Sequence, residues 1–420
     1  MSSPAIPLGG RARPGGLRGF FSREAPTRAQ GAAIARDRWS MSTEARFLVI
    51  ITAALLAFGV ATLYSASAGV ALAAGRPSWH FLARQLTGVA AGVVAFVVLA
   101  KFDAERWKKL AWPLMGLTIV LLLVVVLPFT KSIAPAINGS RRFLLGGSLQ
   151  PSELGKLALV LWTAMLIVKK GGEEGLRRLS KGLLPFLVIL GVLNLLVAAE
   201  PDLSVALFYT IVMGIMLYSA GARIGHFVAV GIAGVPLLWR ELVEREYVLR
   251  RILGFAAGAA DSANSVNHQL QQSLIAVGSG GLFGVGFGQG RQQFGFLPLP
   301  YNDFIGSNIG EEWGFMGMAG LIIAFTAWGY MGFRIAKRAS TPFQQLVAIG
   351  LTVTMLITAY LHIGVVIGLL PTTGLTLPFV SYGRSNILLS LAMTGILVNI
   401  GSTKERVIGA AATDPFAASR

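Results

Sequence analysis

Residues 46–67 read RFLVIITAALLAFGVATLYSAS, and after Arg46 the stretch contains no charged side chain. Its length matches the roughly 20 residues that an α-helix needs to cross the hydrocarbon core of a bilayer. Similar apolar blocks recur along the chain of 420 residues, of which 54% are hydrophobic and 13% charged. Soluble domains carry about twice that charged fraction. The sequence therefore predicts an all-α polytopic membrane protein.

The apolar blocks predict about ten membrane-spanning helices. In chain order they cover 46–67, 81–100, 110–129, 154–168, 183–199, 203–220, 222–239, 309–333, 343–370 and 376–400. A long segment at 240–308 separates the seventh block from the eighth, and a shorter one at 130–153 separates the third from the fourth. Long segments of this kind in compact proteins are usually functional or disordered. The apolar content of 240–308 favours a loop that packs on the outer surface of the helices.

The distribution of positive charge predicts the orientation of the chain. The net charge is +17, and 24 of the 36 Lys and Arg residues fall in the tails and in the short segments on the side of the N-terminus. This bias predicts a protein of the inner (cytoplasmic) membrane type with both termini in the cytoplasm. Because the positive charge lies where membrane topology requires it, nucleic acid is not an expected partner.

Two tails flank the predicted ten-span domain at 45–402: an N-terminal tail at 1–44 and a C-terminal tail at 403–420, both expected in the cytoplasm. The N-terminal tail is rich in Gly, Pro, Ala and Arg and has no apolar periodicity, which predicts disorder. It lacks the continuous apolar core of a signal peptide. Met41 precedes Ser-Thr-Glu-Ala-Arg and is a candidate alternative start, so the sequence leaves both Met1 and Met41 open.

Cysteine and histidine usage limits the chemistry. The chain contains no cysteine, which excludes disulfides, a thiol nucleophile and a cysteine-ligated metal. Its four histidines are scattered, without an H-x-x-x-H spacing. We therefore expect no metal site built from ligands that are close in sequence.

Two arginines, an acid and a lysine mark the segment at 130–153 and the block that follows it. Arg141 and Arg142 come after an Asn-Gly turn signal, and Glu153 and Lys156 lie three residues apart. That spacing places the last two on the same helical face. The cations could extend to lipid headgroups, or they could bind an anionic, phosphate-containing ligand at the outer face. A charge within a span is costly, which favours the second interpretation for Lys156.

Other motifs have simpler structural explanations. Asp202 follows Glu200 at the turn between the fifth and sixth blocks, and it is predicted to cap the next helix. Glu311 and Glu312 open the eighth block, where acids complement the helix dipole. The glycines at 280–290 follow no strand, so they do not form a dinucleotide fingerprint. They predict a tight loop that lies against the helices.

Asp303 is a single acid in an apolar and aromatic stretch just before the eighth block. Burial of a carboxylate in such surroundings strengthens it as a base; a helix cap or an arginine partner is the alternative. The stretch 370–385 is interrupted by Pro371, Gly374 and Pro378, as in broken helices that line cavities. If both stretches meet at the outer face, a cavity beside Asp303 is expected.

Several ordered motifs, spread over nearly the whole of 45–402, resemble those of the SEDS family (shape, elongation, division and sporulation). They are Asn138-Gly139-Ser140-Arg141-Arg142, Gln150-Pro151-Ser152-Glu153-Leu154, Glu200-Pro201-Asp202-Leu203, Gln272-Ser273 with the residues up to Gly281, Asp303-Phe304-Ile305, Gly310-Glu311-Glu312, and Gly374-Leu375-Thr376-Leu377-Pro378 with the residues up to Gly383. Within the family, the last motif and the N-terminal extension look more like the division branch than the elongation branch.

The resemblance implies an inverting glycosyltransferase that polymerises lipid II, a disaccharide-peptide linked to undecaprenyl pyrophosphate, into peptidoglycan at the outer membrane face. Asp303 falls on the essential acid of the family and would be the general base. Lys156 falls on the lysine after the Gln-Pro-Ser-Glu motif and, with Arg141 and Arg142, would offset the pyrophosphate charge. Further substrate contacts are expected at Glu153, Gln272, Ser273, Ser381, Tyr382 and Arg384.

The resemblance also implies partners: lipid II, a class B penicillin-binding transpeptidase and other membrane proteins of the division or elongation complex. It leaves open a divalent cation such as Mg²⁺ or Mn²⁺ as cofactor.

The sequence departs from the family pattern around Asp303. Leu299 and Tyr301 stand where the family usually has Glu and His, Thr373 where the division branch often has Lys, and Arg384 where Gly is usual. The base is kept while its neighbours change, so a non-catalytic scaffold of the division complex stays open. A lipid II transporter (flippase) also stays open, because broken helices and intramembrane charge are features of transporters. Charged residues near helix ends, rather than at mid-bilayer, favour the polymerase.

Overall fold

The computed structural model describes residues 35–127, 130, 134–135, 141–144, 146–177, 182–244, 249, 255 and 265–408. The chain divides into two compact units, Met1–Trp39 with Lys404–Arg420, and Ser40–Thr403. Strand β1 (Ala35–Met41), within the predicted N-terminal tail, pairs with β2 (Ser402–Ile408), which begins at the last residue of the predicted ten-span domain, in a two-stranded sheet. The remaining tail residues, 1–34 and 409–420, lie outside the described residues, as does the Asn138-Gly139 turn.

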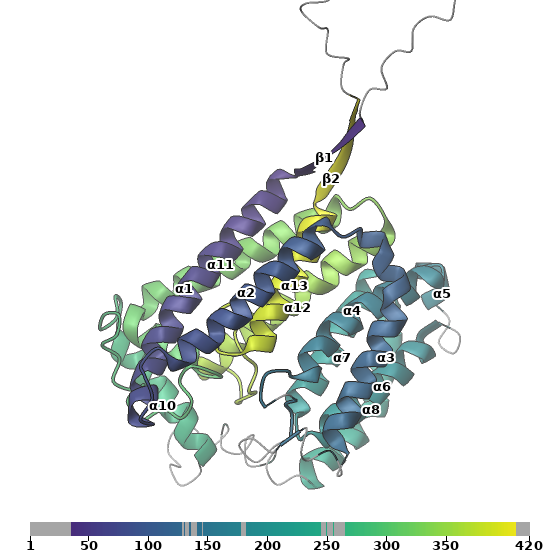
Figure 1. The fold of residues 1–420 in the computed structure, drawn as a ribbon. Helices are drawn as coiled ribbons and strands as arrows, with labels where there is room; N and C mark the ends of the chain where they lie inside the picture. Colours follow the sequence, from purple (N-terminus) through teal and green to yellow (C-terminus); the bar gives the residue numbers. More distant parts are fainter. Residues whose placement is uncertain are drawn as a thin grey trace, which may run out of the picture. The chain divides into compact units, whose positions relative to one another are not determined.

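The other regular elements of the described chain are helices, as the sequence predicts (Figure 1). The helices are α1 (Thr43–Ala73), α2 (His80–Lys101), η1 (Ala104–Arg106), α3 (Trp107–Val126), α4 (Pro151–Lys169), α5 (Glu173–Leu176), α6 (Leu184–Ala199), α7 (Leu203–Ser219), α8 (Ile224–Glu244), α10 (Ser265–Gly280), α11 (Ile305–Lys337), α12 (Pro342–Val366) and α13 (Arg384–Ile400).

All ten predicted spans fall on helices. Six of these are long and apolar enough to cross a bilayer: α1, α2, α3 with η1, α4, α11 and α12. The apolar parts of α6, α7, α8 and α13 are 10–17 residues long, which is shorter than the usual spanning length of roughly 20 residues. The polytopic architecture is therefore confirmed, whereas the count of ten stays a prediction.

Local sequence explains where several helices begin. Ser42 accepts a hydrogen bond from the Ala45 amide and caps α1, and Thr341 does the same for α12 through the Gln344 amide. The Asp202 side chain accepts from the Val205 amide at 3.4 Å and caps α7, which confirms the predicted role. These side chains satisfy backbone donors that have no partner within the helix.

Helix α4 lies at the centre of the second unit. Its side chains from Leu157 to Ile167 are almost all buried, and it packs against α3, α7, α12 and α13. On the other side, α2 runs along α13, and α11 packs between α1 and α12 (Figure 1). A helix that is apolar all round is expected in such an interior position.

The glycine-rich stretch at 280–290 lies against α11, as predicted. Helix α11 is interrupted at Gly314, whose φ is 63°. On either side of this interruption, α11 forms backbone hydrogen bonds with the loop, including Phe315 N to Gly281 O at 2.9 Å and Val285 N to Glu311 O at 3.0 Å. A Cβ on Gly284 would collide with the α11 backbone, so the glycine permits this close approach.

The predicted helix-dipole role of Glu311 and Glu312 was wrong. Helix α11 begins at Ile305 rather than near 309, so neither acid lies in its first turn. The Glu311 carboxylate instead accepts from the Arg291 amide at 2.7 Å, and the Glu312 carboxylate accepts from the Ser65 hydroxyl. The two acids therefore tie the glycine-rich loop and α1 to α11.

Two further boundaries differ from the prediction. The segment at 240–308 is not irregular throughout, because it contains α10 and the end of α8. The last span was expected at 376–400, but α13 begins only at Arg384. Residues 367–383, here called the broken segment, are non-helical, and Phe379 within it has a φ of 64°. Apolar composition does not distinguish a buried irregular segment of this kind from a helix.

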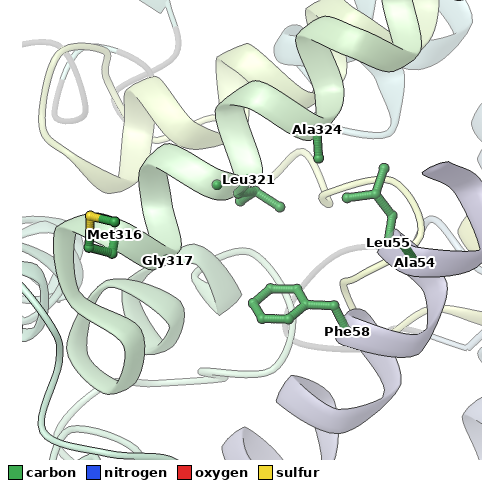
Figure 2. A pocket seen from close by; sticks show the side chains of 8 residues that line it. Ala54, Leu55, Phe58, Met316, Gly317, Leu321 and Ala324 are labelled. Carbon is green, nitrogen blue, oxygen red and sulfur yellow. The ribbon is translucent and has the colours of Figure 1, made fainter.

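A cavity of about 260 Å³ lies between α1 and α11 (Figure 2). It is lined by Ala54, Leu55, Phe58, Met316, Gly317, Gly320, Leu321 and Ala324. These residues offer only apolar side chains and backbone. The cavity therefore provides no side-chain hydrogen-bonding group or charge for a sugar or a phosphate.

A close contact between α1 and the broken segment predicts a specific loss of stability. A Cβ at Gly59 would lie 2.5 Å from the Phe379 carbonyl oxygen and 2.7 Å from Val380 Cα. We expect Gly59→Ala to lower the free energy of unfolding by about 1–3 kcal/mol, because backbone atoms must move apart. Thermal unfolding in detergent measures this change.

The matched control is Gly116→Ala in α3, where an added Cβ meets nothing within 4 Å. This variant should unfold at the same temperature as the unaltered protein or above it, since alanine favours the helix over glycine by roughly 1 kcal/mol. Equal unfolding temperatures for the two variants would contradict the close packing of α1 on the broken segment.

Candidate functional site

Asp303 lies two residues before α11, and its side chain is half-buried. Its neighbours Tyr301 and Phe304 are buried. A Cβ built on Gly374, in the broken segment, would lie 3.7 Å from the Asp303 Oδ2 atom. The two outer stretches that the sequence singled out therefore meet at this carboxylate.

Backbone hydrogen bonds hold the residues before Asp303 against the broken segment. The Tyr382 amide donates to the Tyr301 carbonyl at 2.9 Å, and the Ser381 hydroxyl donates to the Asn302 carbonyl at 2.8 Å. The Ser381 oxygen also accepts from the Leu377 amide at 2.8 Å. Ser381 and Tyr382, both predicted as site residues, are thus joined directly to the chain at Asp303.

An aromatic cluster covers this junction. The ring centroids of Tyr301 and Tyr382 are 5.6 Å apart, and Phe81 of α2 lies 4.5 Å from Tyr301 and 5.5 Å from Tyr382. Burial, with Tyr382 beside it, raises the pKa of Tyr301, so its phenol stays protonated at neutral pH. The residue that replaces the usual histidine of the family is therefore a neutral group here.

Gln85 of α2 contacts the end of the broken segment and was not among the predicted site residues. Its amide nitrogen donates to the Ser381 carbonyl at 3.1 Å, and its amide oxygen accepts from the Gly383 backbone at 3.1 Å. The side chain is almost completely buried. A glutamine within an apolar span is a signal for such a partner, but the sequence does not reveal which distant residue it meets.

Ser273 of α10 has structural partners in the described chain. Its hydroxyl donates to the Val366 carbonyl at 2.8 Å and lies 2.6 Å from the Ser307 hydroxyl of α11, which therefore donates to it. These contacts tie α10 to α11 and α12. Gln272 beside it is half-buried. Substrate contacts at Gln272 and Ser273 stay predictions.

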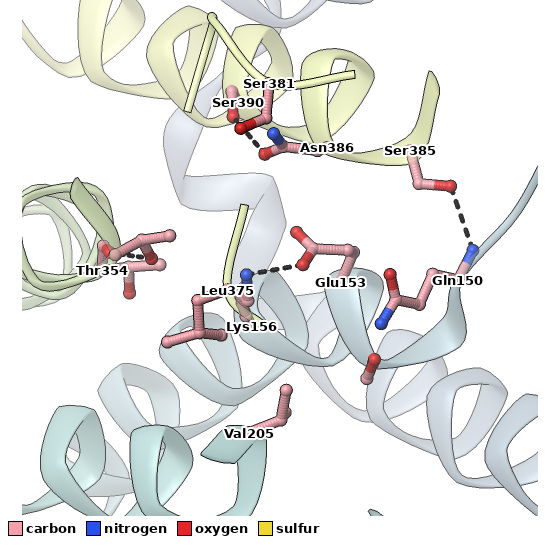
Figure 3. Close-up of polar contacts among 12 residues, drawn as sticks. Gln150, Glu153, Lys156, Val205, Thr354, Leu375, Ser381, Ser385, Asn386 and Ser390 are labelled. Atoms are coloured by element: carbon pink, nitrogen blue, oxygen red, sulfur yellow. Dashed lines mark hydrogen bonds and ion pairs between the residues drawn. The ribbon is translucent and has the colours of Figure 1, made fainter. Parts of the chain in front are cut away.

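Glu153 and Lys156 form a buried ion pair on α4 (Figure 3). The Lys156 Nζ atom lies 2.6 Å from Glu153 Oε1 and 5.2 Å from the centre of the Phe208 ring. Only 3% of Lys156 and 6% of Glu153 is exposed. The predicted placement on one helical face is confirmed, and the pair holds a positive charge in an otherwise apolar helix.

Both arginines of the first outer segment bind protein groups. Arg141 donates to the carbonyls of Ala134 and Leu127, at 3.1 Å and 3.0 Å. Arg142 donates to the Pro201 carbonyl at 2.7 Å and pairs with Asp202 at 3.1 Å. These contacts stabilise the loop after α3 and the turn between α6 and α7. Their predicted role toward a pyrophosphate is not tested by this arrangement.

The start of α13 links the broken segment to the start of α4. The Arg384 side chain donates to the Ser148 hydroxyl, and the Ser385 hydroxyl donates to the Ser148 carbonyl at 2.7 Å. Ser385 in turn accepts from the Gln150 amide at 3.0 Å, directly before α4 (Figure 3). Arg384, which departs from the family pattern, therefore contacts the loop that precedes Glu153 and Lys156.

The stretch 381–385 consequently touches two predicted site regions. Ser381 contacts the residue before Asp303, and Ser385 contacts the residue before α4. Four residues of extended chain reach at most about 14 Å. The start of α4 and the carboxylate of Asp303 are thus held in one region. Among the described residues, no three His, Cys, Asp or Glu side chains gather as a metal site would require.

Glu200, at the turn between α6 and α7, is a buried acid that the sequence analysis treated only as part of this turn. It is 2% exposed, and burial, with Asp202 beside it, raises its pKa to about 8, although Arg142 acts in the opposite direction. A carboxyl group with such a pKa is protonated at neutral pH in the folded protein.

The buried pair on α4 predicts a large, partner-dependent effect on stability. We expect Lys156→Met to lower the free energy of unfolding by about 3–5 kcal/mol, because Glu153 would stay buried without its counter-ion. Adding Glu153→Gln should recover much of this loss, since both charges are then absent. Thermal unfolding of the two variants in detergent compares them.

The control is Lys108→Met, which removes an ion pair with Glu105. In this pair about one third of each side chain is exposed. Exposed pairs contribute only about 0–1 kcal/mol. The buried pair would be contradicted if Lys156→Met lowered the free energy of unfolding as little as Lys108→Met does. It would also be contradicted if adding Glu153→Gln restored none of the lost stability.

The shifted carboxyl of Glu200 predicts a pH dependence of stability. Because its pKa rises from 4.5 to about 8 on folding, the folded state binds the extra proton, and stability falls as pH rises through this window. The slope contributed by one such group is about 1.4 kcal/mol per pH unit. Glu200→Gln should remove this slope between pH 6 and 8, as measured by thermal unfolding against pH.

Glu174→Gln is the matched control, because Glu174 is an exposed acid. It should keep the pH slope of the unaltered protein. If the curves of Glu200→Gln and the unaltered protein run parallel over this range, the carboxyl is not protonated on folding.

Known proteins are similar to this chain in both sequence and fold. The family model of FtsW, RodA and SpoVE, described as "Cell cycle protein", matches residues 46–406. A "Probable peptidoglycan glycosyltransferase FtsW" of Trichlorobacter lovleyi is 38% identical over 357 residues, 84% of this chain and 92% of the relative. "Stage V sporulation protein E" of Bacillus subtilis is 37% identical over 358 residues, 84% of this chain and 95% of the relative.

Solved structures of similar fold point to the same family. The rod shape determining protein RodA of Thermus thermophilus has a TM-score of 0.60 at 27% identity, over 84% of this chain and 95% of that chain. A chain of a solved structure described as "Structural coordination of polymerization and crosslinking by a peptidoglycan synthase complex" has a TM-score of 0.68 at 26% identity, over 84% of this chain and 96% of that chain. Sequence and fold together show that the chain belongs to the FtsW/RodA/SpoVE family, the SEDS family that its motifs resemble.

Proposed function

We propose that this multi-pass membrane protein is a peptidoglycan glycosyltransferase that polymerises lipid II, with Asp303 as the general base. The observation that carries the proposal is the placement of a carboxylate and a buried cation at one end of the helices. Asp303 and the start of α4, which bears Lys156, are held together through residues 381–385. A base and a positive charge are what sugar transfer from a pyrophosphate requires.

In this reaction, the hydroxyl of the acceptor sugar attacks the anomeric carbon of the donor. A carbon–oxygen bond forms, the bond from that carbon to the pyrophosphate breaks, and the hydroxyl proton passes to the Asp303 carboxylate. Attack opposite the leaving group inverts the anomeric centre and needs no covalent intermediate. Lys156, with Arg141 and Arg142, would offset the charge that develops on the departing pyrophosphate.

The site and the first and last residues of the helical unit, Ser42 and Gly401, lie at opposite ends of the helices. Arg334 and Arg338, near the end of α11, pair with Glu44 at the start of α1, and the Ser42 amide donates to the Gly401 carbonyl. Asp303 precedes the other end of α11, a helix of 33 residues and thus roughly 50 Å of helical path. With the termini in the cytoplasm, Asp303 lies at the outer face of the cytoplasmic membrane.

Relatives named as peptidoglycan glycosyltransferases support the substrate, and the solved peptidoglycan synthase complex supports a transpeptidase partner. We infer a class B penicillin-binding transpeptidase as that partner, within a division complex. The Lys and Arg distribution supports tails at 1–44 and 403–420 that face the cytoplasm. Lipid II carries its pyrophosphate at the membrane surface, which suits a site at a helix end.

The decisive variant is Asp303→Asn, which keeps the size of the side chain and removes the base. We expect polymerisation of lipid II to fall by about 10²–10⁴-fold. The assay uses the purified protein with its transpeptidase partner and detects glycan strands by gel electrophoresis.

The matched control is Asp103→Asn, an aspartate that caps the short helix η1 at the other end of the molecule. It should polymerise lipid II normally. Full activity of Asp303→Asn would remove Asp303 from the mechanism. Transfer of labelled lipid II across vesicles by the protein alone, without polymerisation, would instead favour the transporter hypothesis.

A further inference from the structure

His362 of α12 joins two pieces of backbone that lie on either side of Asp303. Its Nδ1 atom is 2.9 Å from the Leu375 carbonyl oxygen of the broken segment. Its Nε2 atom is 3.3 Å from the Gly306 amide in the first turn of α11. The imidazole is 1% exposed, so these two protein groups, rather than bulk water, define its hydrogen bonding.

The two partners fix the form of the imidazole. A backbone carbonyl can only accept a hydrogen bond and a backbone N–H can only donate one. Nδ1 must therefore carry the hydrogen and donate to Leu375, while Nε2 keeps its lone pair and accepts from Gly306. His362 is thus a neutral imidazole of one tautomer. A second hydrogen on Nε2 would face the N–H of Gly306 and break that bond.

Both contacts lie next to the proposed base. Gly306 follows Asp303 by three residues, and Leu375 follows Gly374, whose Cβ position would be 3.7 Å from Asp303 Oδ2. The ring therefore sets the distance between the first turn of α11 and the part of the broken segment that faces the carboxylate. Gly306 itself has little space, because a Cβ there would lie 3.2 Å from His362 Nε2.

The contacts of His362 complement those on the other side of Asp303. Residues 301 and 302 are already held by Tyr382 and Ser381. Without His362, the first turn of α11 at Gly306 and the broken segment at Leu375 would lose the polar contacts through which α12 links them. A general base has to lie within about 3 Å of the proton that it removes, so a small displacement of either piece matters.

We propose that His362 is a positioning residue, whose neutral imidazole holds Asp303 at the distance from the acceptor hydroxyl that proton transfer requires. This inference rests on the proposed glycosyltransferase function. His362 does not touch the reacting atoms. It acts through the two backbone segments that carry and face Asp303.

Three substitutions separate the two hydrogen bonds. In His362→Asn, the amide nitrogen occupies the place of Nδ1 and can still donate to Leu375. In His362→Gln, the amide oxygen occupies the place of Nε2 and can still accept from Gly306. His362→Leu fills much of the same space with an apolar side chain and loses both bonds. Each variant is measured with its transpeptidase partner in the lipid II polymerisation assay, which yields kcat and KM.

We expect His362→Leu to lower kcat by about 10–100-fold, because misplacement of a catalytic group by about 1 Å can have an effect of this size. The KM for lipid II should change little, since His362 contacts no substrate. His362→Asn and His362→Gln should each lie between His362→Leu and the unaltered protein. This order is not expected from a side chain that only fills space.

The control is Thr358→Val, one turn earlier on α12, which removes a buried hydrogen bond from the Thr358 hydroxyl to the Thr354 carbonyl at 2.7 Å. It should lower the unfolding temperature without lowering kcat. If Thr358→Val lowers kcat as much as His362→Leu does, or if the three His362 variants keep full kcat, the inference is wrong. Should His362→Leu fail to fold, the Asn and Gln variants still have to show a lowered kcat.

The assay distinguishes the proposed function from the positioning role of His362. Absence of polymerisation by the unaltered protein would overturn the proposed function and this inference with it. Normal polymerisation that requires Asp303, together with unchanged kcat in the His362 variants, would overturn the positioning role alone.

Discussion

The need to hydrogen-bond every buried backbone group shapes the region around Asp303. The broken segment has no helical ladder, yet its residues from Leu377 to Ser381 are buried. An unpaired amide or carbonyl in such surroundings is costly. Its partners are therefore polar side chains supplied by neighbouring helices: Gln85 for Ser381 and Gly383, His362 for Leu375, and Asn386 for Leu377. The groups that satisfy the segment are also the groups that fix its position.

This constraint links fold to function. A continuous helix at 376–400 would satisfy its own backbone, and the Tyr382 amide would then not be free to donate to the Tyr301 carbonyl. Because the helix is interrupted, Ser381 and Tyr382 contact the chain at Asp303, while Ser385 contacts the residue before α4. The broken segment and the first turn of α13 thus join α2, α4, α11 and α12 around Asp303, which supports the proposed site at this end of the helices.

The sequence predicted what depends on local or periodic features. The spans follow from apolar blocks of about bilayer length, the cap at Asp202 from its position in a turn, and the pairing of Glu153 with Lys156 from helical spacing. It did not predict contacts between residues far apart in the chain. Glu312 meets Ser65, and Gln85 meets Ser381, across more than 240 positions. Pro and Gly at 371–378 indicated an interrupted segment, but the start of the last span was predicted at 376 instead of Arg384, because a buried irregular segment and a buried helix have the same composition.

Lys156 is already paired with Glu153 before any substrate binds in the proposed reaction. A lone buried ammonium would be strongly disfavoured, so Glu153 stabilises it while no substrate is bound. A pyrophosphate that approaches Lys156 has to compete with this carboxylate, and the more negative ligand has the stronger Coulomb attraction in a low dielectric. As charge develops on the departing pyrophosphate, its attraction for Lys156 increases, whereas that of Glu153 does not. Lys156 would therefore contribute more to the transition state than to the bound substrate, which is the condition for catalysis.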